Sequence, residues 1–202
     1  MSIHDIFRIP IYEVQLDLDI KKLQSFCNEY QHKDTGKILS NVGGYHSNDL
    51  PLNKLKWPLG ESLHPLIKEI GIHSSKFAKE FIKNNEQVLS NMWINMGLYK
   101  DANKTHNHPG ADISGVYYVK TPDDCGNIVF EHPALDVLNY YSPETSKEFN
   151  EYNEYNSPTW WKPAVENHLY LFPGWLKHYV EPNLNKTEER ISISFNIHQK
   201  GE

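Results

Sequence analysis

The chain has 202 residues, of which 39% are hydrophobic and 12% aromatic, which is enough to bury the core of one folded domain. A net charge of −6, without a stretch dense in Lys and Arg, argues against a nucleic-acid binder. No apolar run approaches the ~18 residues of a membrane helix, so we expect no membrane span.

Residues 7–16 alternate between apolar and polar side chains and predict a strand. Asp19 is a typical N-cap residue, and it precedes a helical pattern over residues 20–30. One face of that helix is expected to carry Ile20, Leu23 and Cys27.

Two cysteines, Cys27 and Cys125, lie far apart and form no CxxC pair. Such isolated thiols are typical of a reducing compartment, so we expect a cytoplasmic protein with free cysteines.

Residues 33–60 are rich in Gly, Asn, Ser and Pro and predict a long irregular connection. A second helical pattern covers residues 63–82. Gly71 lies inside it, which leaves open whether this is one helix or two.

From about residue 87 onward, strand patterns replace the helical ones. The predicted strands are residues 91–99, 113–120, 127–132, 168–173, 176–182 and 190–198. Helices followed by strands indicate an α+β fold, with helical support over 19–84 and an all-β core over about 87–198. We expect residues 1–202 to form a single domain.

Residues 139–163 show no clean periodicity and predict a long excursion from the sheet. Two interpretations stay open: a lid or substrate cleft, or packing against the helices of residues 19–82. The aromatic side chains in question are Tyr140, Tyr141, Tyr152, Tyr155, Trp160 and Trp161.

The pair His106 and His108 is the most informative motif. In an extended chain, residues i and i+2 point to the same side, so both imidazoles can face one metal ion. The alternative is two exposed loop histidines beside Pro109. His178 lies in a strand pattern seventy residues further on, and is a candidate for a distant third ligand or a half-buried structural histidine.

The strand over residues 190–198 has one apolar and one polar face, which is typical of a strand that lines a cavity in a barrel-like fold. Arg190 and Ser192 lie on the polar face. A guanidinium with a hydroxyl two residues later suits a carboxylate, although an edge strand facing solvent would show the same pattern.

A set of motifs in the second half of the chain resembles the 2-oxoglutarate- and Fe(II)-dependent oxygenases of marine bacteria and phages, distant relatives of the prolyl hydroxylases. The motifs are HNHPGADISGVYYVKTP, GNIVFEHP, LYLFPGWLKHYVEPN and RISISFN. The resemblance covers about residues 87–198, and SNVGGYHS at 40–47 is also similar to an upstream pattern of that family.

The resemblance implies a double-stranded β-helix of the jelly-roll or cupin-like type, with N-terminal helices packed on one sheet. It implies Fe(II) bound by His106 and His178, and no catalytic residue beyond the metal ligands. The residues implied to bind the cosubstrate 2-oxoglutarate are Arg190 at its distal carboxylate, with Tyr118, Ser192 and Asn95.

The implied activity is that of a 2-oxoglutarate-dependent dioxygenase, a hydroxylase that releases succinate and CO2, with ascorbate as a candidate reductant. Its partners would be 2-oxoglutarate, O2 and an unidentified substrate, either a peptidyl residue or a small molecule. The sequence leaves the oligomeric state open, a homo-oligomer included.

One position departs from the family pattern, because His108 stands where HxD or HxE would place a carboxylate. The third ligand is then His108, or Asp112 from four residues later, or a non-protein ligand such as water or chloride. We favour His108 because the i+2 spacing fits an extended chain.

Two other functions compete with this one: a cupin-like three-histidine metal enzyme that does not use 2-oxoglutarate, and a non-catalytic β-sandwich binding module. Arg190 with Ser192 disfavours the first, and metal uptake would exclude the second.

Overall fold

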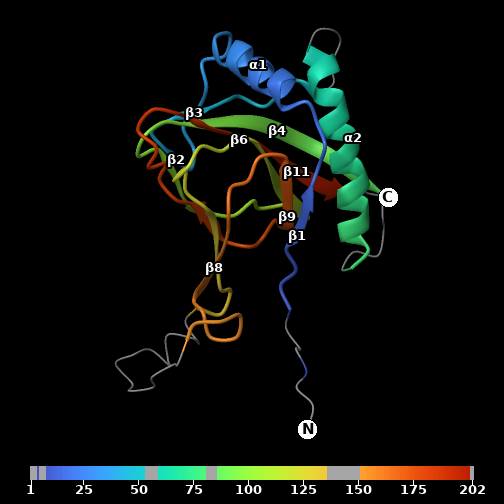
Figure 1. The fold of residues 1–202 in the computed structure, drawn as a ribbon. Helices are drawn as coiled ribbons and strands as arrows, with labels where there is room; N and C mark the ends of the chain where they lie inside the picture. Colours follow the sequence, from blue (N-terminus) through green and yellow to red (C-terminus); the bar gives the residue numbers. More distant parts are fainter. Residues whose placement is uncertain (1–3, 5–7, 53–58, 81–85, 136–150, 201–202) are drawn as a thin grey trace.

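The computed structural model describes residues 4, 8–52, 59–80, 86–135 and 151–200. These residues form three layers: a helical layer, a six-stranded sheet and a five-stranded sheet. In Figure 1, one helix lies above the six-stranded sheet and the other runs down its right-hand side.

The first helix, α1, spans Ile20–Gln31, and the Asp19 side chain caps it by accepting from the Lys22 backbone N–H at 3.1 Å. Its buried side chains are Leu23, Phe26 and Cys27. The predicted helix and its cap are therefore confirmed. Ile20, expected on the same face, is only partly buried, because it lies in the first turn at the end of the layer.

The second helix, α2, spans Leu59–Ala78 and runs without interruption through Gly71. A Cβ at Gly71 would contact nothing within 4 Å, and the buried stripe of Leu63, Leu66, Ile70 and Phe77 continues on both sides of it. Packing of that stripe outweighs the helix cost of one exposed glycine. Ile82, the expected end, lies outside the described residues. Neither helix has the length and apolar character needed to cross a membrane, among the residues that the structure describes.

Both sheets are antiparallel. The six-stranded sheet has the order β1 (Tyr12–Gln15), β9 (His168–Pro173), β6 (Ile113–Lys120), β11 (Arg190–Gln199), β4 (Gln87–Gly97) and β3 (Tyr45–His46). The five-stranded sheet has the order β2 (Asn41–Val42), β5 (Ala102–His106), β10 (His178–Val180), β7 (Ile128–Glu131) and β8 (Thr159–Lys162).

All six strands predicted from residue 91 onward are confirmed. The opening strand is confirmed only over Tyr12–Gln15, and Phe7 lies outside the described residues. The short strands β2 and β3 lie in the region 33–60, which was expected to be irregular. They depend on pairing with β5 and β4 rather than on their own sequence pattern.

The chain passes back and forth between the sheets from β4 onward. Strands β4, β6, β9 and β11 belong to the six-stranded sheet, and β5, β7, β8 and β10 belong to the five-stranded one. This is the double-stranded β-helix that was expected, with the helices on one sheet. An α+β fold with an all-β core is thus confirmed.

The main core lies between the helices and the outer face of the six-stranded sheet. Apolar residues of the two central strands point into it: Met92, Ile94, Met96, Ile191, Ile193, Phe195 and Ile197. A smaller cluster lies between the sheets, formed by Val116, Tyr118, Ile128, Phe130, Tyr170, Phe172 and Leu176. Because β4 and β11 turn their polar faces to this inner side, a polar cavity is left beside the smaller cluster.

A two-glycine turn closes one side of the space between the sheets. Gly43 and Gly44 join β2 to β3, which lie at the edges of opposite sheets, and both have positive φ, at 68° and 64°. A Cβ at Gly43 would lie 1.9 Å from Asp101 Oδ1, and one at Gly44 would lie 2.7 Å from the Met96 carbonyl oxygen. Only glycine fits this turn.

The described part of the predicted excursion, residues 151–163, does not pack against the helices. It leads into β8, which pairs with β7 at the edge of the five-stranded sheet, on the opposite side of the molecule from α1 and α2 (Figure 1). Its aromatic side chains are exposed: Tyr152, Tyr155, Trp160 and Trp161. Of the two interpretations left open, packing against the helices does not hold for these four residues. Tyr140 and Tyr141 lie outside the described residues.

Candidate metal centre and cosubstrate pocket

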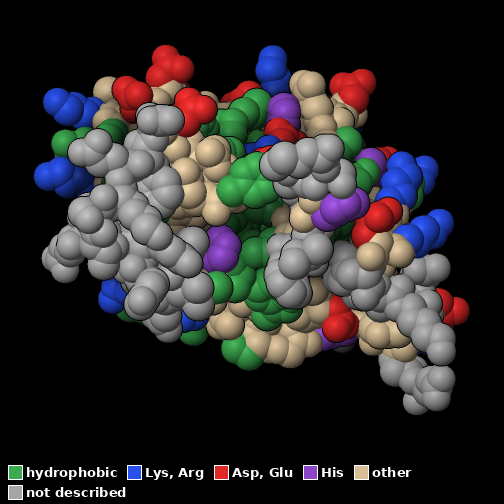
Figure 2. All heavy atoms as spheres, turned by 90° about the horizontal axis from the view of Figure 1, so that it is seen from below, with side chains coloured by type: hydrophobic (Ala, Val, Ile, Leu, Met, Phe, Trp, Pro, Cys, Tyr) green, Lys and Arg blue, Asp and Glu red, His purple; other side chains and the backbone are tan. Residues whose placement is uncertain are grey.

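A cavity of about 290 Å³ lies between the two sheets. Both sheets contribute to its wall, and so does the β2–β3 turn. The face of the molecule that Figure 2 shows is hollowed near its centre, where hydrophobic side chains gather with a histidine beside them. The residues considered below all line the cavity: His46, Trp93, Asn95, His106, His108, Tyr118, His178, Arg190 and Ser192.

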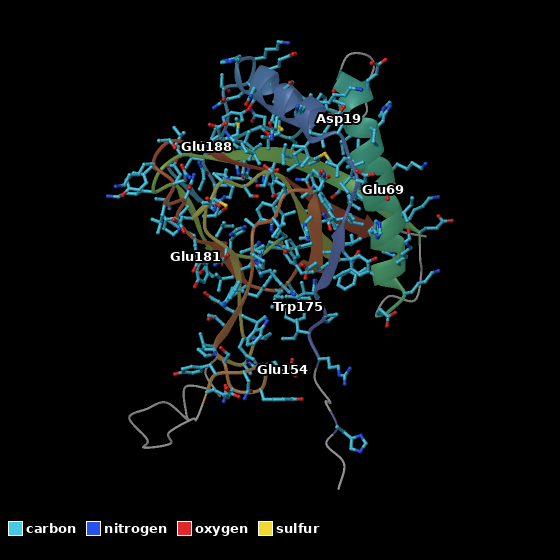
Figure 3. All side chains as sticks on the ribbon, viewed as in Figure 1. Asp19, Glu69, Glu154, Trp175, Glu181 and Glu188 are labelled. Carbon is cyan, nitrogen blue, oxygen red and sulfur yellow. The ribbon has the colours of Figure 1, made fainter. Side chains whose placement is uncertain are left out.

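Three histidines meet at this cavity. His106 ends β5 and His178 begins β10, and these two residues are opposite each other in the β5–β10 ladder. His108 follows β5 and is anchored through its backbone N–H, which donates to the Gly174 carbonyl at 2.8 Å. Figure 3 shows Trp175, next to that anchor, on the side of the sheets away from the helices. One ring nitrogen from each histidine lies within 4.8 Å of the others.

The backbone fixes the orientation of two of these rings. Nδ1 of His106 lies 2.7 Å from the Lys104 carbonyl oxygen, and Nδ1 of His178 lies 2.9 Å from the Leu176 carbonyl oxygen. A carbonyl only accepts, so each Nδ1 carries the proton and each Nε2 presents a lone pair. Nε2 of His178 lies 3.3 Å from Nε2 of His108, so the two nitrogens face the same point.

Burial keeps the three imidazoles neutral. It lowers the pKa of His106, it lowers the pKa of His108 to about 4, and it lowers the pKa of His178 to about 3. His178 is 3% exposed and the other two are half-buried. Neutral imidazole is the form that binds a metal, and imidazole suits Fe(II) as it suits zinc, copper or nickel. The group therefore fits a first-row metal ion.

Asp112 does not join the three histidines. Its carboxylate accepts a hydrogen bond from the Gln199 backbone N–H at 2.6 Å, at the far end of β11. Among the described residues, the group that could hold a metal contains no carboxylate. The structure contradicts the alternative that Asp112 supplies the third ligand. After His108 the chain makes a turn, closed by the Ala111 backbone N–H donating to the His108 carbonyl at 3.1 Å, and it then leads Asp112 to β11.

Arg190 is a buried cation without an anionic partner. It is 5% exposed, and none of the ion pairs among the described residues includes it. Its Nη1 donates to the backbone carbonyls of Cys125 and, at 3.1 Å, of Glu181. The Glu181 carboxylate is engaged elsewhere, by the backbone and side-chain amides of Asn127 (Figure 3 labels Glu181). An uncompensated buried guanidinium is costly, so this site fits an anionic ligand such as the 2-oxoglutarate carboxylate.

Tyr118 and Ser192 lie beside Arg190, while Asn95 lies on the next strand. Ser192 pairs with Tyr118 on one side and with Asn95 on the other, so the three side chains share one row across the sheet. Tyr118 is fully buried, and burial raises the pKa of its phenol, so it stays a neutral donor. Asn95 Nδ2 donates to Ser194 Oγ at 3.0 Å.

Two residues of the wall were not expected there. His46 is buried on β3 and its ring stacks on Trp93, with centroids 5.7 Å apart. Trp93 in turn lies 5.7 Å, centroid to centroid, from His108. The segment SNVGGYHS carries His46, but no periodicity in so short a strand indicates which way a side chain points.

Comparison with known proteins places the chain among oxygenases. A family model described as "Putative 2OG-Fe(II) oxygenase" matches residues 91–196. No curated protein sequence shows a significant match.

Solved structures share the fold at low sequence identity. A Pseudomonas putida prolyl-4-hydroxylase matches with a TM-score of 0.63 and 11% identity, over 96% of this chain and 94% of that chain. A Trichoplax adhaerens prolyl hydroxylase, in complex with a hypoxia-inducible factor peptide, matches with a TM-score of 0.64 and 13% identity. The match covers 94% of this chain and 83% of that chain. HygX from Streptomyces hygroscopicus, with nickel and 2-oxoglutarate bound, matches with a TM-score of 0.58 and 10% identity. The match covers 95% of this chain and 84% of that chain. The family model covers more than half of the sequence, so this chain belongs to the 2-oxoglutarate- and Fe(II)-dependent oxygenases, enzymes that use Fe(II) as cofactor and 2-oxoglutarate as cosubstrate.

Proposed function

We propose that the chain holds Fe(II) with His106, His108 and His178 and hydroxylates a C–H bond of its substrate, with release of succinate and CO2. When bound, the metal supplies the redox chemistry by which 2-oxoglutarate, O2 and a C–H bond give succinate, CO2 and an alcohol. The convergence of three neutral imidazole nitrogens supports this assignment.

The protein's own contribution on the metal side is orientation. The carbonyls of Lys104 and Leu176 hold the rings of His106 and His178 so that each Nε2 would be free to bind the ion, and the Gly174 carbonyl fixes the backbone of His108. A third imidazole in place of a carboxylate leaves the ion one charge more positive, which changes its redox behaviour.

In the same cavity, Arg190 would receive the distal carboxylate of 2-oxoglutarate. Its Nη1 is already tied to backbone carbonyls, which holds the guanidinium plane in place before the ligand arrives. Tyr118 and Ser192 would donate hydroxyl hydrogen bonds to the same carboxylate, and Asn95 lies in their row.

The buried guanidinium of Arg190, which has no ion-pair partner among the described residues, carries this proposal, because it separates two kinds of three-histidine enzyme. An enzyme that does not use a 2-oxoacid has no need of a buried cation in the wall of its cavity.

We also propose that the helices and the strands work as one oxygenase domain. The main core supports this, since it combines side chains of α1 and α2 with those of β4, β6, β9 and β11 in one continuous cluster. Removal of the helical layer would expose the outer face of the sheet that carries Arg190.

The test replaces Arg190 with Met, which keeps the length of the side chain and removes its charge. Titration of the Fe(II)-loaded protein with 2-oxoglutarate without oxygen is followed by the metal-to-ligand charge-transfer band. We expect the Kd for 2-oxoglutarate to rise about a hundredfold, since a charged hydrogen-bonded pair in a buried site is lost.

Lys120→Met is the matched control. Lys120 is a partly buried cation on β6, but it pairs with Glu188 and Glu189 outside the cavity, so its loss should leave the Kd unchanged. Equal affinities in wild type and Arg190→Met would contradict the proposal, as would a wild-type protein that binds Fe(II) but not 2-oxoglutarate.

A further inference from the structure

The ring of His108 is the least anchored of the three proposed metal ligands. Nδ1 of His106 and Nδ1 of His178 each lie at hydrogen-bonding distance from a backbone carbonyl, 2.7 Å and 2.9 Å away. Among the described residues, the only hydrogen-bonding contact of the His108 ring is that of its Nε2 with Nε2 of His178, at 3.3 Å. Within that part of the chain, no carbonyl or carboxylate holds Nδ1 of His108, so hydrogen bonding does not fix the orientation of this ring.

The backbone of His108, by contrast, is held on both sides. Its N–H donates to the Gly174 carbonyl at 2.8 Å, and its own carbonyl accepts from the Ala111 N–H at 3.1 Å. The position of the Cα atom is therefore fixed, while the ring can still rotate about the two bonds of its side chain. What remains to orient the imidazole is contact with neighbouring side chains.

Three rings lie next to the His108 imidazole. Two of them belong to His106 and His178, each with its centroid 5.1 Å away, and the third is the Trp93 indole, at 5.7 Å and an angle of 34°. The two histidines are themselves proposed ligands of the metal. Of the rings that contact His108 in the described part of the chain, Trp93 alone could support it without binding the ion.

Trp93 is well placed to act as a rigid support. It lies inside β4, opposite Ser194 of β11, and its side chain is 8% exposed. The buried ring of His46 lies nearly parallel to the indole, at 22° and with centroids 5.7 Å apart. A side chain on a paired central strand, packed against a second buried ring, has little freedom to move. The indole can therefore define where the His108 imidazole lies.

We propose that Trp93 is a positioning residue that holds the His108 imidazole in place as the third metal ligand, the task that backbone carbonyls perform for His106 and His178. This inference rests on the proposed function, in which all three histidines bind Fe(II). At the position where the family pattern has a carboxylate, an imidazole is then oriented by an aromatic wall instead of by a hydrogen bond.

The experiment measures the Kd of the full chain for Fe(II) by equilibrium dialysis without oxygen. Trp93→Leu removes the indole and keeps an apolar side chain, and Trp93→Phe restores an aromatic ring. The double variant Trp93→Leu/His108→Ala is compared with His108→Ala alone, because a residue that acts only through His108 has no effect once that ring is gone. Co(II), bound in place of Fe(II), reports the ligand set through its visible absorption spectrum.

Phe172→Leu is the matched control. The Phe172 ring packs on His178 with centroids 4.7 Å apart, which is closer than Trp93 lies to His108, at 5.7 Å. The Leu176 carbonyl lies 2.9 Å from Nδ1 of His178 and would still hold that ring. Loss of the Phe172 ring should therefore leave the Kd for Fe(II) within about threefold of wild type.

We expect Trp93→Leu to raise the Kd for Fe(II) about tenfold, the loss that is typical when a group that orients a metal ligand is removed. Trp93→Phe should recover most of this affinity. In the His108→Ala background, the Trp93→Leu change should alter the Kd by less than about twofold. The Co(II) spectrum of Trp93→Leu should shift toward the spectrum of His108→Ala.

The inference is overturned if Trp93→Leu binds Fe(II) as tightly as wild type, if it weakens binding equally with and without His108, or if Phe172→Leu weakens binding as much as Trp93→Leu does. A wild-type protein that binds no Fe(II) would overturn the proposed function as well, whereas each of the other outcomes leaves the proposed function standing. Thermal unfolding of each metal-free variant shows whether it is folded, and Trp93→Met carries the test if Trp93→Leu is not.

Discussion

His178 is the most buried of the three histidines, and its ring packs against Phe172 and Phe130, with centroids 4.7 Å and 6.1 Å away. His178→Ala removes one of the three proposed ligands, and the group that could hold a metal among the described residues has no fourth member to replace it. We expect Fe(II) affinity to fall more than a hundredfold, measured by equilibrium dialysis without oxygen.

His132→Ala is the comparison for this variant, because the His132 ring lies outside the group and hydrogen-bonds to the Ala134 backbone N–H. Retention of one tightly bound Fe(II) per chain in His178→Ala would show that the metal is held elsewhere.

The buried His46 also predicts a pH dependence of folding. Burial lowers the pKa of His46 to about 4, below its ordinary value near 6.5. The unfolded chain therefore binds a proton that the folded chain refuses, so the contribution of His46 to stability is complete above pH 6.5 and is lost as the pH falls toward 4.

At pH 5 this loss amounts to about 2 kcal/mol for His46. Urea unfolding of the metal-free protein at pH 7 and pH 5 should show a fall in the free energy of unfolding that is about 2 kcal/mol smaller in His46→Phe than in wild type. An identical fall in both proteins would mean that the His46 ring is protonated as readily in the folded chain as in the unfolded one.

Two glycines in different elements are predicted to respond to alanine in opposite directions. Gly115 on β6 lies opposite Phe195 on β11, and a Cβ there would approach Phe195 Cζ to 2.4 Å and Leu171 Cδ2 to 2.8 Å, both in the main core. We expect Gly115→Ala to destabilise the protein by about 1–3 kcal/mol, because the strands and their packed rings must separate.

Gly71→Ala should instead stabilise the protein by up to about 1 kcal/mol, since alanine is the better helix former and the new methyl meets nothing within 4 Å. Chemical denaturation of Gly115→Ala and Gly71→Ala measures the free energy of unfolding of each variant. An equal change in the free energy of unfolding in both variants would contradict the close packing at Gly115 and the open space at Gly71.

At the level of strands, alternation predicted faces well. On β11, the predicted split is confirmed, because Ile191, Ile193 and Phe195 belong to the main core while Arg190 and Ser192 line the cavity. Strand ends and short strands were less predictable: β10 is only three residues long, and β2 and β3 have two residues each. Such strands exist because a partner strand is present, and pairing partners are distant in sequence.

For the whole molecule, the position of the cavity predicts that ligands stabilise the fold. Arg190, Tyr118 and Ser192 come from the six-stranded sheet, whereas His106 and His178 come from the five-stranded sheet. A metal and a cosubstrate bound together would therefore connect both sheets, and the unfolded chain would lose them.

With Fe(II) bound and 2-oxoglutarate at a hundred times its Kd, we expect stabilisation of about 2.7 kcal/mol and a rise in Tm of roughly 5–10 °C. Thermal unfolding without oxygen measures the rise in Tm, and we expect only a small rise in Tm for His178→Ala. A ligand-induced shift of the same size in His178→Ala would place the binding outside the histidine group.

The sequence by itself indicated the family, six of the eight strands from β4 to β11, the first helix with its Asp19 cap, and the two faces of β11. It did not predict β5 or β8. The features that it indicated follow from local rules: period-two alternation, capping chemistry, and motifs such as HNHPG and RISIS whose residues lie close together in the chain. His106, His108, His178, Arg190, Tyr118 and Ser192 were named from those motifs, and their ligand roles stay predictions.

Only the tertiary structure decided which residues the side chains on each face of a strand or helix contact. It turned Asp112 away to the Gln199 backbone, continued α2 through Gly71, kept residues 151–163 off the helices, and brought His46 onto Trp93 beside the histidine group. The reason is that a repeat in sequence fixes the direction of a side chain relative to its own strand. The atoms it meets depend on which distant strand pairs or packs there, and on how the pairing of β2 and β3 closes the space between the sheets.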